Sequence, residues 1–354
     1  MKTITVSASK TYDILIGAGL LDEAGAIIRK AAGGRTAAII TDDNVSALYE
    51  ERLHNSLAEN DYRVVRYEFP HGESSKNAGT LISIINLLAE EKLSRSDLVI
   101  ALGGGVTGDL AGFAAACYMR GVRFIQIPTT LLAMVDSSVG GKTAINLAAG
   151  KNLAGAFYQP NAVICDVTTL ATLTPEVYRD GCAEIIKYGV IADRALFESL
   201  ITPVNMQLED VIARCVEIKR DIVTEDEYEN GIRKLLNFGH TIGHAIELLS
   251  GYHISHGHAV AEGIAVVTRA AVRMGICAES CLGDVVQMLR RYDLPVHTTY
   301  EADKLAFACL SDKKRSGESL TMIFPTELGK CVLKEIPVKE FESVIRLGLG
   351  DTYA

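Results

Sequence analysis

The residues best suited to chemistry lie in one stretch, residues 233–258, which holds five of the eight histidines of the chain. His240 and His244 are four residues apart in an apolar run that predicts a helix, so both would lie on one face, one turn apart. Two imidazoles with this spacing can reach one divalent metal ion. A zincin helix would have glutamate directly after the first histidine, but a threonine stands there. His256 and His258 follow a Gly-Tyr turn, and the whole stretch indicates a metal or proton-transfer site.

The composition bounds the class of protein. A length of 354 residues favours about two domains, and a hydrophobic share of 48% is enough for a large core. The net charge of −9 argues against a surface that binds nucleic acid or an anionic membrane. We expect no membrane span, because no apolar run approaches about 18 residues, and no signal peptide, because the N-terminus lacks an apolar core. Eight scattered cysteines without a CxxC pair predict reduced thiols in a cytoplasm.

The first half of the chain alternates short apolar strands with amphipathic helices, which is typical of βαβ units and a parallel sheet. The expected strands are 2–6, 12–16, 36–40, 62–69, 98–102, 123–128 and 161–166, and the expected helices are 20–32, 45–59, 77–92 and 110–118. After Pro175 the pattern changes to long amphipathic helices with one strand-like segment, 319–324. The sequence therefore predicts an α/β domain over residues 1–174 and a mostly helical domain over residues 175–354.

A glycine-rich turn follows the expected strand 98–102, where Gly103, Gly105 and Gly108 fit the G-x-G-x-x-G pattern. Such a turn lets the backbone approach a pyrophosphate, which the amides of a helix N-terminus then face. The next strand ends without the acidic residue expected at an adenosine ribose, whereas an Asp-Asp pair, 42–43, ends an earlier strand. We predict a dinucleotide site on a doubly wound sheet without the ordinary Rossmann order. The alternative is a turn that only serves helix packing.

Three lysines and one acid stand in unusual settings. Lys142 lies in a Gly-Gly-Lys-Thr run, but a P-loop would need glycine where Asp136 stands, so we expect no nucleoside triphosphate site. Lys142 and Lys151 each follow a glycine in a small-residue loop that could enclose an anion, although both could equally be solvated. Glu184 and Lys187 are three residues apart in an apolar helix, where an acid is costly unless it is paired or binds a metal.

Four stretches of the chain resemble the 3-dehydroquinate synthase family of sugar-phosphate cyclases. They are residues 118–145, residues 150–153, residues 183–189 (Ala-Glu-Ile-Ile-Lys-Tyr-Gly) and residues 236–247 (Leu-Asn-Phe-Gly-His-Thr-Ile-Gly-His-Ala-Ile-Glu). The resemblance extends from about residue 42 to residue 325. It implies the fold of the glycerol dehydrogenase and iron-dependent alcohol dehydrogenase group. In that fold a Rossmann-like NAD-binding domain, here 1–174, precedes a helical domain for metal and substrate, here 175–354.

The resemblance also implies an activity in the shikimate pathway of aromatic amino acid and chorismate biosynthesis. The family converts 3-deoxy-D-arabino-heptulosonate 7-phosphate to 3-dehydroquinate and phosphate. NAD would be reduced transiently at C5, phosphate eliminated, C5 reduced again and the ring closed by an aldol reaction. The implied cofactors are NAD and zinc or cobalt, and the implied form is a cytoplasmic homodimer without nucleic-acid or membrane partners. The alternatives are another cyclase such as 2-deoxy-scyllo-inosose or valiolone synthase, a polyol or glycerol-phosphate dehydrogenase, and an inactive regulator.

The family motifs imply a role for individual residues. The metal ligands would be Glu184, His240 and His256, so the two histidines four residues apart would not both bind the metal. The catalytic residues would be Glu229, His244, Lys142 and Arg233. From the residues alone, Glu229 belongs to a solvated acidic turn, so its assignment depends on the resemblance.

The implied ligand contacts fall into two sets. The NAD contacts would be Asp42, Asn44, Gly72, Glu73, Ser74, Ser75, Lys76, Gly104, Gly105, Val106, Thr107, Gly108, Asp109, Thr129, Thr130, Lys142, Lys151, Thr169, Leu170, Ala171 and Thr172. The substrate contacts would be Arg120, Asp136, Lys142, Asn152, Lys187, Lys219, Arg233, Asn237, His244 and Lys314 or its neighbour Lys313.

Two features of the chain bear on these assignments. Arg233, Asn237 and His240 would share one face of a single helix, where a guanidinium can hold the substrate carboxylate near the metal. Asp180 and Asp221 depart from the residues usual in the family, and neither belongs to the metal set.

Overall fold

The computed structural model describes residues 1–312 and 318–350, which fold into two compact units. Unit 1 comprises Met1–Thr174 and Leu208–Glu227, and unit 2 comprises Pro175–Gln207 and the chain from Tyr228 onward. The sequence placed residues 208–227 in the second domain, whereas the helix α8 (Leu208–Glu225) packs on the first strands of unit 1. An ion pair between Lys219 and Asp136 attaches α8 to this unit.

Unit 1 is built on a seven-stranded sheet in the order β1-β2-β9-β6-β5-β3-β4. Its strands are β1 (Lys2–Ser7), β2 (Thr11–Gly17), β3 (Thr36–Asp42), β4 (Arg63–Phe69), β5 (Leu98–Gly103), β6 (Arg123–Pro128) and β9 (Ala162–Asp166). Neighbouring strands pair in parallel except β1 and β2, which form an antiparallel edge. The predicted doubly wound parallel sheet is therefore confirmed.

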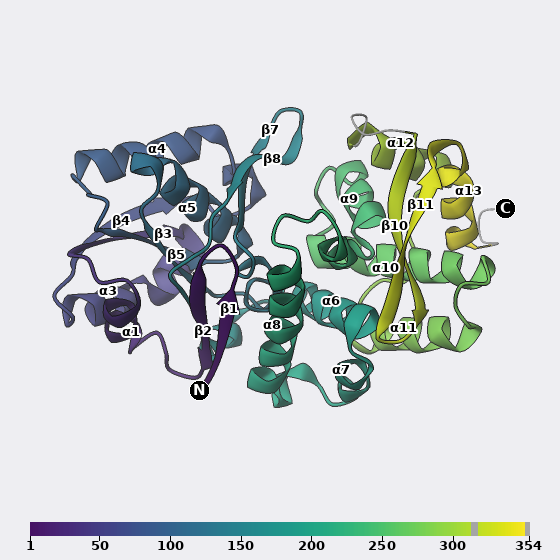
Figure 1. The fold of residues 1–354 in the computed structure, drawn as a ribbon, viewed down its shortest axis with the longest axis horizontal. Helices are drawn as coiled ribbons and strands as arrows, with labels where there is room; N and C mark the ends of the chain where they lie inside the picture. The colour runs from purple at the N-terminus through teal and green to yellow at the C-terminus, as the bar shows by residue number, and fades with distance from the viewer. Residues whose placement is uncertain (313–317, 351–354) are drawn as a thin grey trace. The chain divides into compact units, whose positions relative to one another are not determined.

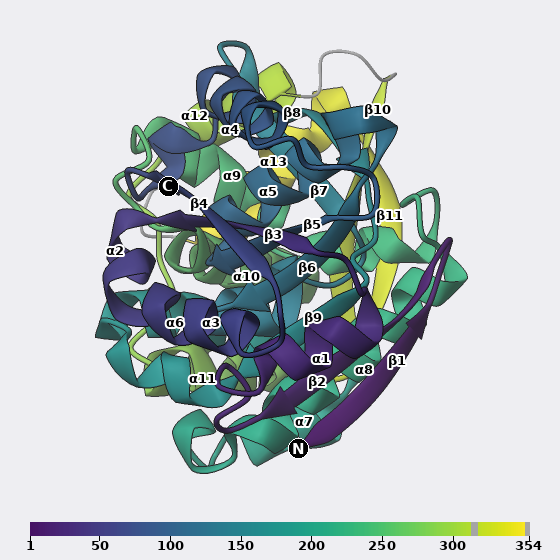
Figure 2. The same ribbon diagram turned by 90° about the vertical axis from the view of Figure 1, so that its left-hand side faces the viewer.

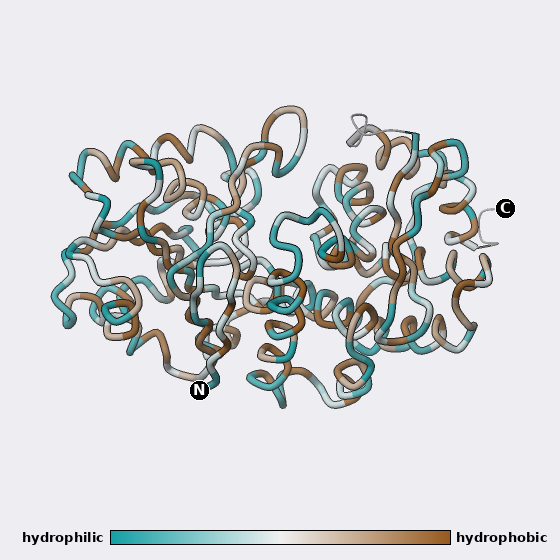
Figure 3. The backbone as a smooth tube through the Cα atoms, in the orientation of Figure 1, coloured by the Kyte–Doolittle hydropathy of each residue, from teal (hydrophilic) through white to brown (hydrophobic). Residues whose placement is uncertain are grey.

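Helices cover both faces of this sheet (Figure 1; Figure 2 gives the view onto its edge). The helices α1 (Ala24–Ala31) and α3 (Glu51–Ala58) pack on one face, and α4 (Ala78–Glu90) and α5 (Gly105–Cys117) pack on the other. A short helix α2 (Asp43–Val45) and a π-helical turn lead into α3. The strands between the two layers are mostly hydrophobic (Figure 3), because both of their faces are buried.

The order of the strands creates a switch point at β3. The chain adds β4 on one side of β3 and then returns to add β5 on the other side, so β3 lies between them. Open α/β sheets bind ligands at such a point, outside the carboxyl ends of the strands. Here β3 ends at Asp42 and β5 ends at Gly103, so the acidic pair and the glycine-rich turn belong to neighbouring strand ends.

Lys142 and Lys151 lie on strands, so the predicted small-residue loop is wrong. The strands β7 (Lys142–Leu147) and β8 (Gly150–Phe157) form a separate antiparallel hairpin, in which Thr143 Oγ1 donates a hydrogen bond of 2.9 Å to the Ala156 carbonyl. A Cβ at Gly155 would lie 2.1 Å from the Thr143 carbonyl oxygen. The small residues therefore permit a close approach of two strands. In the sequence, a run of such small residues resembles a loop.

Unit 2 is mostly helical. Its elements are α6 (Pro175–Ala192), α7 (Arg194–Ser199), α9 (His240–Leu249), α10 (His256–Arg273), α11 (Glu279–Arg291), α12 (Ala302–Asp312), α13 (Val338–Leu349) and an antiparallel hairpin of β10 (Ser319–Glu327) and β11 (Lys330–Pro337). The helix α10 contacts α6, α9, α11 and α13, and most of its side chains are buried (Figure 1). Within the described part of the chain, no helix has the length and apolar character to cross a membrane.

The single helix predicted through Arg233, Asn237 and His240 does not exist. A 3₁₀ turn covers Ile232–Asn237, and Gly239 then has a positive φ of 78° before α9 begins at His240. A Cβ at Gly239 would lie 2.6 Å from Ile264 Cγ1, so both the backbone conformation and the contact require glycine. His240 and His244 do share α9, with ring centroids 5.5 Å apart.

Candidate functional site

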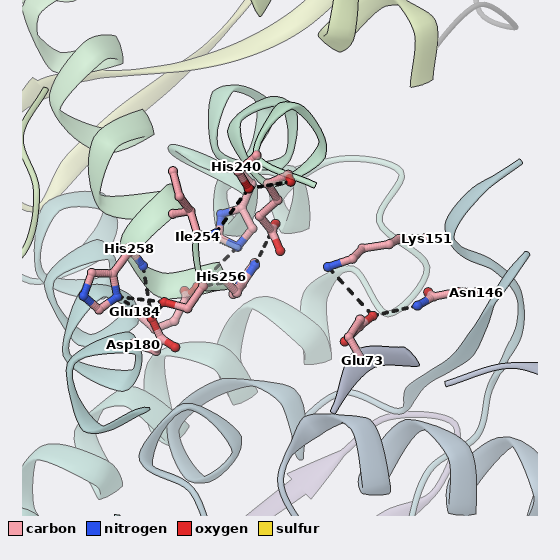
Figure 4. A network of polar contacts seen from close by, with 12 residues as sticks. Glu73, Asn146, Lys151, Asp180, Glu184, His240, Ile254, His256 and His258 are labelled. Carbon is pink, nitrogen blue, oxygen red and sulfur yellow. Dashed lines mark hydrogen bonds and ion pairs between the residues drawn. The ribbon is translucent and has the colours of Figure 1, made fainter. Parts of the chain in front are cut away.

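A buried carboxylate is the centre of the candidate site in unit 2. Glu184 lies on α6 with 0% of its surface exposed, and Lys187 Nζ lies 2.6 Å from its Oε2. The two imidazoles approach its other oxygen, with His240 Nε2 at 3.4 Å and His256 Nε2 at 3.3 Å from Oε1 (Figure 4). The helix α6 and the two consecutive helices α9 and α10 thus bring one carboxylate and two imidazoles together.

The electrostatics of this cluster favour a positive charge beside Glu184. Burial alone would raise the pKa of Glu184, but the Lys187 ammonium and His240 outweigh it and hold this pKa well below its usual range. Burial opposes the charged form of His256, but its interactions with the carboxylates of Glu184 and Glu247 prevail and raise the pKa of His256 to about 10. The pocket therefore favours a cation where the two rings meet the carboxylate.

The donor set fits a divalent metal ion. One ligand atom from each of Glu184, His240 and His256 lies within 4.8 Å of the others. Glu184 Oε1 is buried without a hydrogen-bond partner of good geometry among the described residues, although two ring nitrogens face it. A bound cation would satisfy that oxygen. One carboxylate and two imidazoles form a donor set that catalytic zinc sites use.

A second group of potential ligands shares one of these histidines. His244, Glu247 and His256 also offer donor atoms within 4.8 Å of one another. The His244 ring is exposed, and its centroid lies 5.8 Å from that of His256. His244 therefore lies beside the first group.

Asp180, which departs from the residue usual in the family, forms hydrogen bonds with the start of α10. Its Oδ1 accepts hydrogen bonds from Ser255 Oγ at 2.6 Å, from the His258 amide at 3.1 Å and from His258 Nδ1 at 2.8 Å (Figure 4). A Cβ at Gly257 would lie 2.2 Å from Asp180 Cα, so α6 and α10 are in close contact here. His258 is thus hydrogen-bonded to Asp180, which lies on α6 one helical turn before Glu184.

The other predicted residues of unit 2 lie on the segments before α9 and on α6. Glu229 has a positive φ of 62°, and its Oε1 accepts a hydrogen bond of 2.6 Å from Asn237 Nδ2. Glu229 is thus hydrogen-bonded rather than simply solvated. Arg233 is 1% exposed on the 3₁₀ turn, which contacts α6. Lys314 and Lys313 lie outside the described residues.

In unit 1 some of the predicted NAD residues lie at the switch point. Thr107 Oγ1, on the first turn of α5, donates a hydrogen bond of 3.3 Å to Asp42 Oδ2 at the end of β3. The helix α5 begins at Gly105, five residues earlier than expected, so its first amides belong to the glycine-rich turn itself. A Cβ at Gly105 would lie 3.2 Å from Ser137 Oγ, which leaves little room beside the turn.

Unit 1 also contains two sets of polar contacts, one around Lys76 and one around Glu73. The buried Lys76 contacts Asp109 and Asn152 through its ammonium. Burial raises the pKa of Asp109, and this effect is larger than the opposing one of Lys76. Glu73 accepts a hydrogen bond of 2.7 Å from Asn146 Nδ2 and lies 3.8 Å from Lys151 Nζ (Figure 4).

The remaining predicted residues of unit 1 occupy strand ends, turns and the hairpin. Gly72, Glu73, Ser74 and Ser75 form the turn after β4, Asn44 lies in α2, and Gly104, Val106 and Gly108 surround the start of α5. Thr129 and Thr130 directly follow β6, whereas Thr169, Leu170, Ala171 and Thr172 form the 3₁₀ turn after β9. Arg120 is exposed with a positive φ of 64°, Lys142 opens β7, and Lys219 donates a hydrogen bond of 2.7 Å to the Asp136 carbonyl.

The sequence offered a signal for one residue that no prediction singled out. Glu247 is 3% exposed on α9, seven residues after His240, and its Oε2 lies 3.2 Å from His256 Nδ1. A charged residue in an apolar helical run is the same signal that identified Glu184. Applied to residues 240–249, it would have identified Glu247 too.

The whole fold is similar to that of two cyclases of known structure. A 2-deoxy-scyllo-inosose synthase, solved with carbaglucose-6-phosphate, NAD+ and Co2+, has a TM-score of 0.88 at 28% identity and covers 98% of this chain and 100% of its own. The 2-epi-5-epi-valiolone synthase of Streptomyces hygroscopicus subsp. jinggangensis, solved with NAD+ and Zn2+, has a TM-score of 0.86 at 27% identity, with 98% of each chain covered. A probable glycerol dehydrogenase of Sinorhizobium meliloti, at 15% identity and a TM-score of 0.63, covers 95% of this chain and 96% of its own and shares the fold alone. Fold and ligand cluster thus define a class, that of the sugar-phosphate cyclases.

The sequence comparisons specify the family within this class. The model for the 3-dehydroquinate synthase N-terminal part matches residues 66–180, and that for the C-terminal part matches residues 181–315. A 3-dehydroquinate synthase of Streptococcus suis is 41% identical over 346 residues, which cover 95% of this chain and 98% of the relative. The chain belongs to the 3-dehydroquinate synthase family.

Loss of a single ligand is expected to abolish metal binding, because a three-ligand site has no spare donor. We expect Glu184→Gln, His240→Ala and His256→Ala each to lose the bound metal and the activity. His258→Ala should retain the metal, since Asp180 keeps its bonds to Ser255 and to the backbone. Metal analysis of the four purified variants checks this, and a chain that needs His258 but not His256 would contradict the assignment.

The glycine-rich turn is expected to bind NAD through its backbone. Gly105→Val should raise the dissociation constant for NAD by about tenfold or more, because the side chain would occupy the space that a pyrophosphate needs. The fold should survive, since the nearest atom to the new Cβ is the mobile Ser137 Oγ at 3.2 Å. Calorimetric titration with NAD measures the effect, with Gly283→Val, where nothing lies within 4 Å of a Cβ, as the control. An unchanged dissociation constant would show that the turn serves only helix packing and does not bind NAD.

Proposed function

We propose that this chain converts 3-deoxy-D-arabino-heptulosonate 7-phosphate to 3-dehydroquinate and phosphate, with NAD and a divalent metal ion as cofactors. The observation that carries the proposal is the buried Glu184, whose Oε1 faces the Nε2 atoms of His240 and His256 at 3.4 and 3.3 Å. Family membership supports the activity, and the switch point at β3 and β5 supports a nucleotide at the strand ends.

The cofactors would supply Lewis acidity at the substrate hydroxyls and a hydride acceptor that is restored within each turnover. Glu184, His240 and His256 would hold the metal. The substrate C5 hydroxyl is oxidised to a ketone, which acidifies the proton on C6. Loss of that proton expels the phosphate at C7, C5 is then reduced, and ring opening and an aldol reaction close the carbocycle.

Two residues of unit 2 are proposed to move protons in this sequence. His244 is exposed next to the ligand rings, where an imidazole can exchange protons near neutral pH. Glu229 is held by Asn237, so its carboxylate has a defined orientation. The proposed catalytic role of Lys142 follows from the family motif alone.

The buried guanidinium of Arg233 is proposed to hold the substrate carboxylate. A planar guanidinium can bind a carboxylate through two parallel hydrogen bonds, which an ammonium cannot reproduce. Arg233 is 1% exposed, so its charge is shielded from bulk water and acts strongly on a nearby anion. This feature favours a sugar acid over the substrates of the inosose and valiolone cyclases, which carry a phosphate but no carboxylate.

Three finer points stay predictions. Zinc and cobalt are both proposed metals, because the names of the two similar cyclase structures give Co2+ and Zn2+. The NAD and substrate contacts named from the motifs are proposed as ligand contacts. A homodimer and a cytoplasmic location are expected from the family.

The activity is tested by following phosphate release from the heptulosonate phosphate with only trace NAD. We expect many phosphates per NAD and no net NADH, because hydride returns to C5 within the turnover. Removal of metal with a chelator should stop the release, and added Co2+ or Zn2+ should restore it. Net NADH would indicate a dehydrogenase, and turnover of glucose 6-phosphate without reaction of the heptulosonate would indicate the inosose cyclase.

Arg233→Lys is expected to keep metal and NAD and to lower kcat/KM by about 10- to 100-fold. The loss corresponds to roughly 1.4–3 kcal/mol, the contribution of a charge-assisted hydrogen bond. Inhibition by a substrate analogue without the carboxylate should hardly change. Arg346→Lys, on an exposed ion pair of α13, is the matched control. Equal losses for analogues with and without the carboxylate would show that Arg233 does not recognise that group.

A further inference from the structure

Each proposed histidine ligand has a hydrogen-bond acceptor on the side of the ring away from Glu184. The His240 Nδ1 lies 3.1 Å from the Phe238 carbonyl oxygen, and the His256 Nδ1 lies 3.2 Å from Glu247 Oε2. A carbonyl oxygen and an ionised carboxylate can only accept, so Nδ1 carries the hydrogen in both rings. Both Nε2 atoms face Glu184 Oε1, and with the hydrogen held on Nδ1 each can donate an electron pair to a metal that replaces its own hydrogen.

The two acceptors differ in charge and in origin. Phe238 is two residues before His240, so its carbonyl is part of the local backbone break. Glu247 lies on α9 and reaches His256 on another helix, α10, and it is 3% exposed. A buried carboxylate on the outer nitrogen of an imidazole fixes the ring and makes it a more basic ligand.

His256 could bind a metal through either ring nitrogen, and the two positions of the metal exclude one another. Toward Glu184 the ring presents Nε2, and toward Glu247 it presents Nδ1. A metal in the group of His244, Glu247 and His256 would have to displace the hydrogen bond to Glu247 and would lie beside the exposed His244 ring. A metal beside Glu184 keeps that hydrogen bond and satisfies a buried oxygen.

We propose that Glu247 is a positioning residue of the metal centre, which holds His256 in the orientation and tautomer that direct Nε2 toward the metal. The inference rests on the proposed metal centre and assigns Glu247 a place outside the ligand set. Its carboxylate joins α9 to α10, so one side chain links two of the three elements that carry ligands.

The test measures metal affinity of the full-length chain, with Co2+ alone as the probe. Apoprotein is titrated by calorimetry for the wild type, Glu247→Gln and Glu247→Leu. The leucine variant should bind Co2+ about 10- to 100-fold more weakly, the usual effect of losing an outer partner of a ligand. The glutamine variant keeps an acceptor oxygen but loses the charge, so its affinity should lie between those of the leucine variant and the wild type.

A matched control separates positioning from stability. Glu262 is a buried acid on α10, the helix of His256, and its interactions are a hydrogen bond to Thr298 and an electrostatic one with His258. Glu262→Gln should leave the Co2+ affinity and the visible absorption of bound Co2+ unchanged. Glu247→Gln should shift that absorption, because the electron donation of His256 changes. The nearly isosteric glutamine variant also decides the question if the leucine variant does not fold.

Two results would overturn the assignment of Glu247 alone. Unchanged Co2+ affinity and absorption in both Glu247 variants would show that Glu247 only stabilises the fold. Loss of Co2+ in Glu247→Gln as complete as in Glu184→Gln would make Glu247 a ligand and favour the group that contains His244. A wild-type chain that binds no Co2+ would instead overturn the metal centre itself, and the role of Glu247 with it.

Discussion

The structure of unit 2 depends on the cost of burying the carboxylate of Glu184. An ionised group without water is tolerated only when opposite charges and hydrogen bonds surround it. The Lys187 ammonium forms an ion pair with one oxygen from the same helix, and imidazoles from α9 and α10 face the other. Three helices must therefore meet within a few ångströms. The close contacts at Gly257 and at Gly263, where a Cβ would lie 2.1 Å from the Gly239 carbonyl oxygen, allow α10 to come near enough.

The proposed anion site of unit 1 depends on a different source of positive charge. The order of its strands brings the ends of β3 and β5 together, and the first amides of α5 begin at the glycine-rich turn. Helix amides carry a partial positive charge without a charged side chain. The buried Lys76 adds a full charge and forms an ion pair with Asp109. In the proposed sites, unit 1 would thus bind its ligand mainly through backbone amides, and unit 2 would bind its ligand through titratable side chains.

The sequence predicted the parts of the fold that depend on local periodicity. Strands buried on both faces, amphipathic helices and the acid in the apolar helix at Glu184 all carry signals within a few residues. The break at Gly239 escaped prediction, because the apolar pattern continues through it and the residue that the glycine approaches closely, Ile264, is distant in sequence. The β7–β8 hairpin escaped for the same reason, since its small residues have meaning only when the strands are paired. Glu247 had a local signal, but its partner, His256, is identified only by the fold.

The assignment of α8 to unit 1 has a consequence for how the chain is made and how it can be divided. The polypeptide passes from one unit to the other three times, after residues 174, 207 and 227. During synthesis the sheet of unit 1 emerges first, but the helix that pairs Lys219 with Asp136 emerges only after the first two helices of unit 2. Unit 1 cannot reach its final form on the ribosome before part of its neighbour has been made. A fragment that ends at residue 174 would lack α8 and expose the surface that it covers, so no continuous stretch of the chain encodes the whole of unit 1.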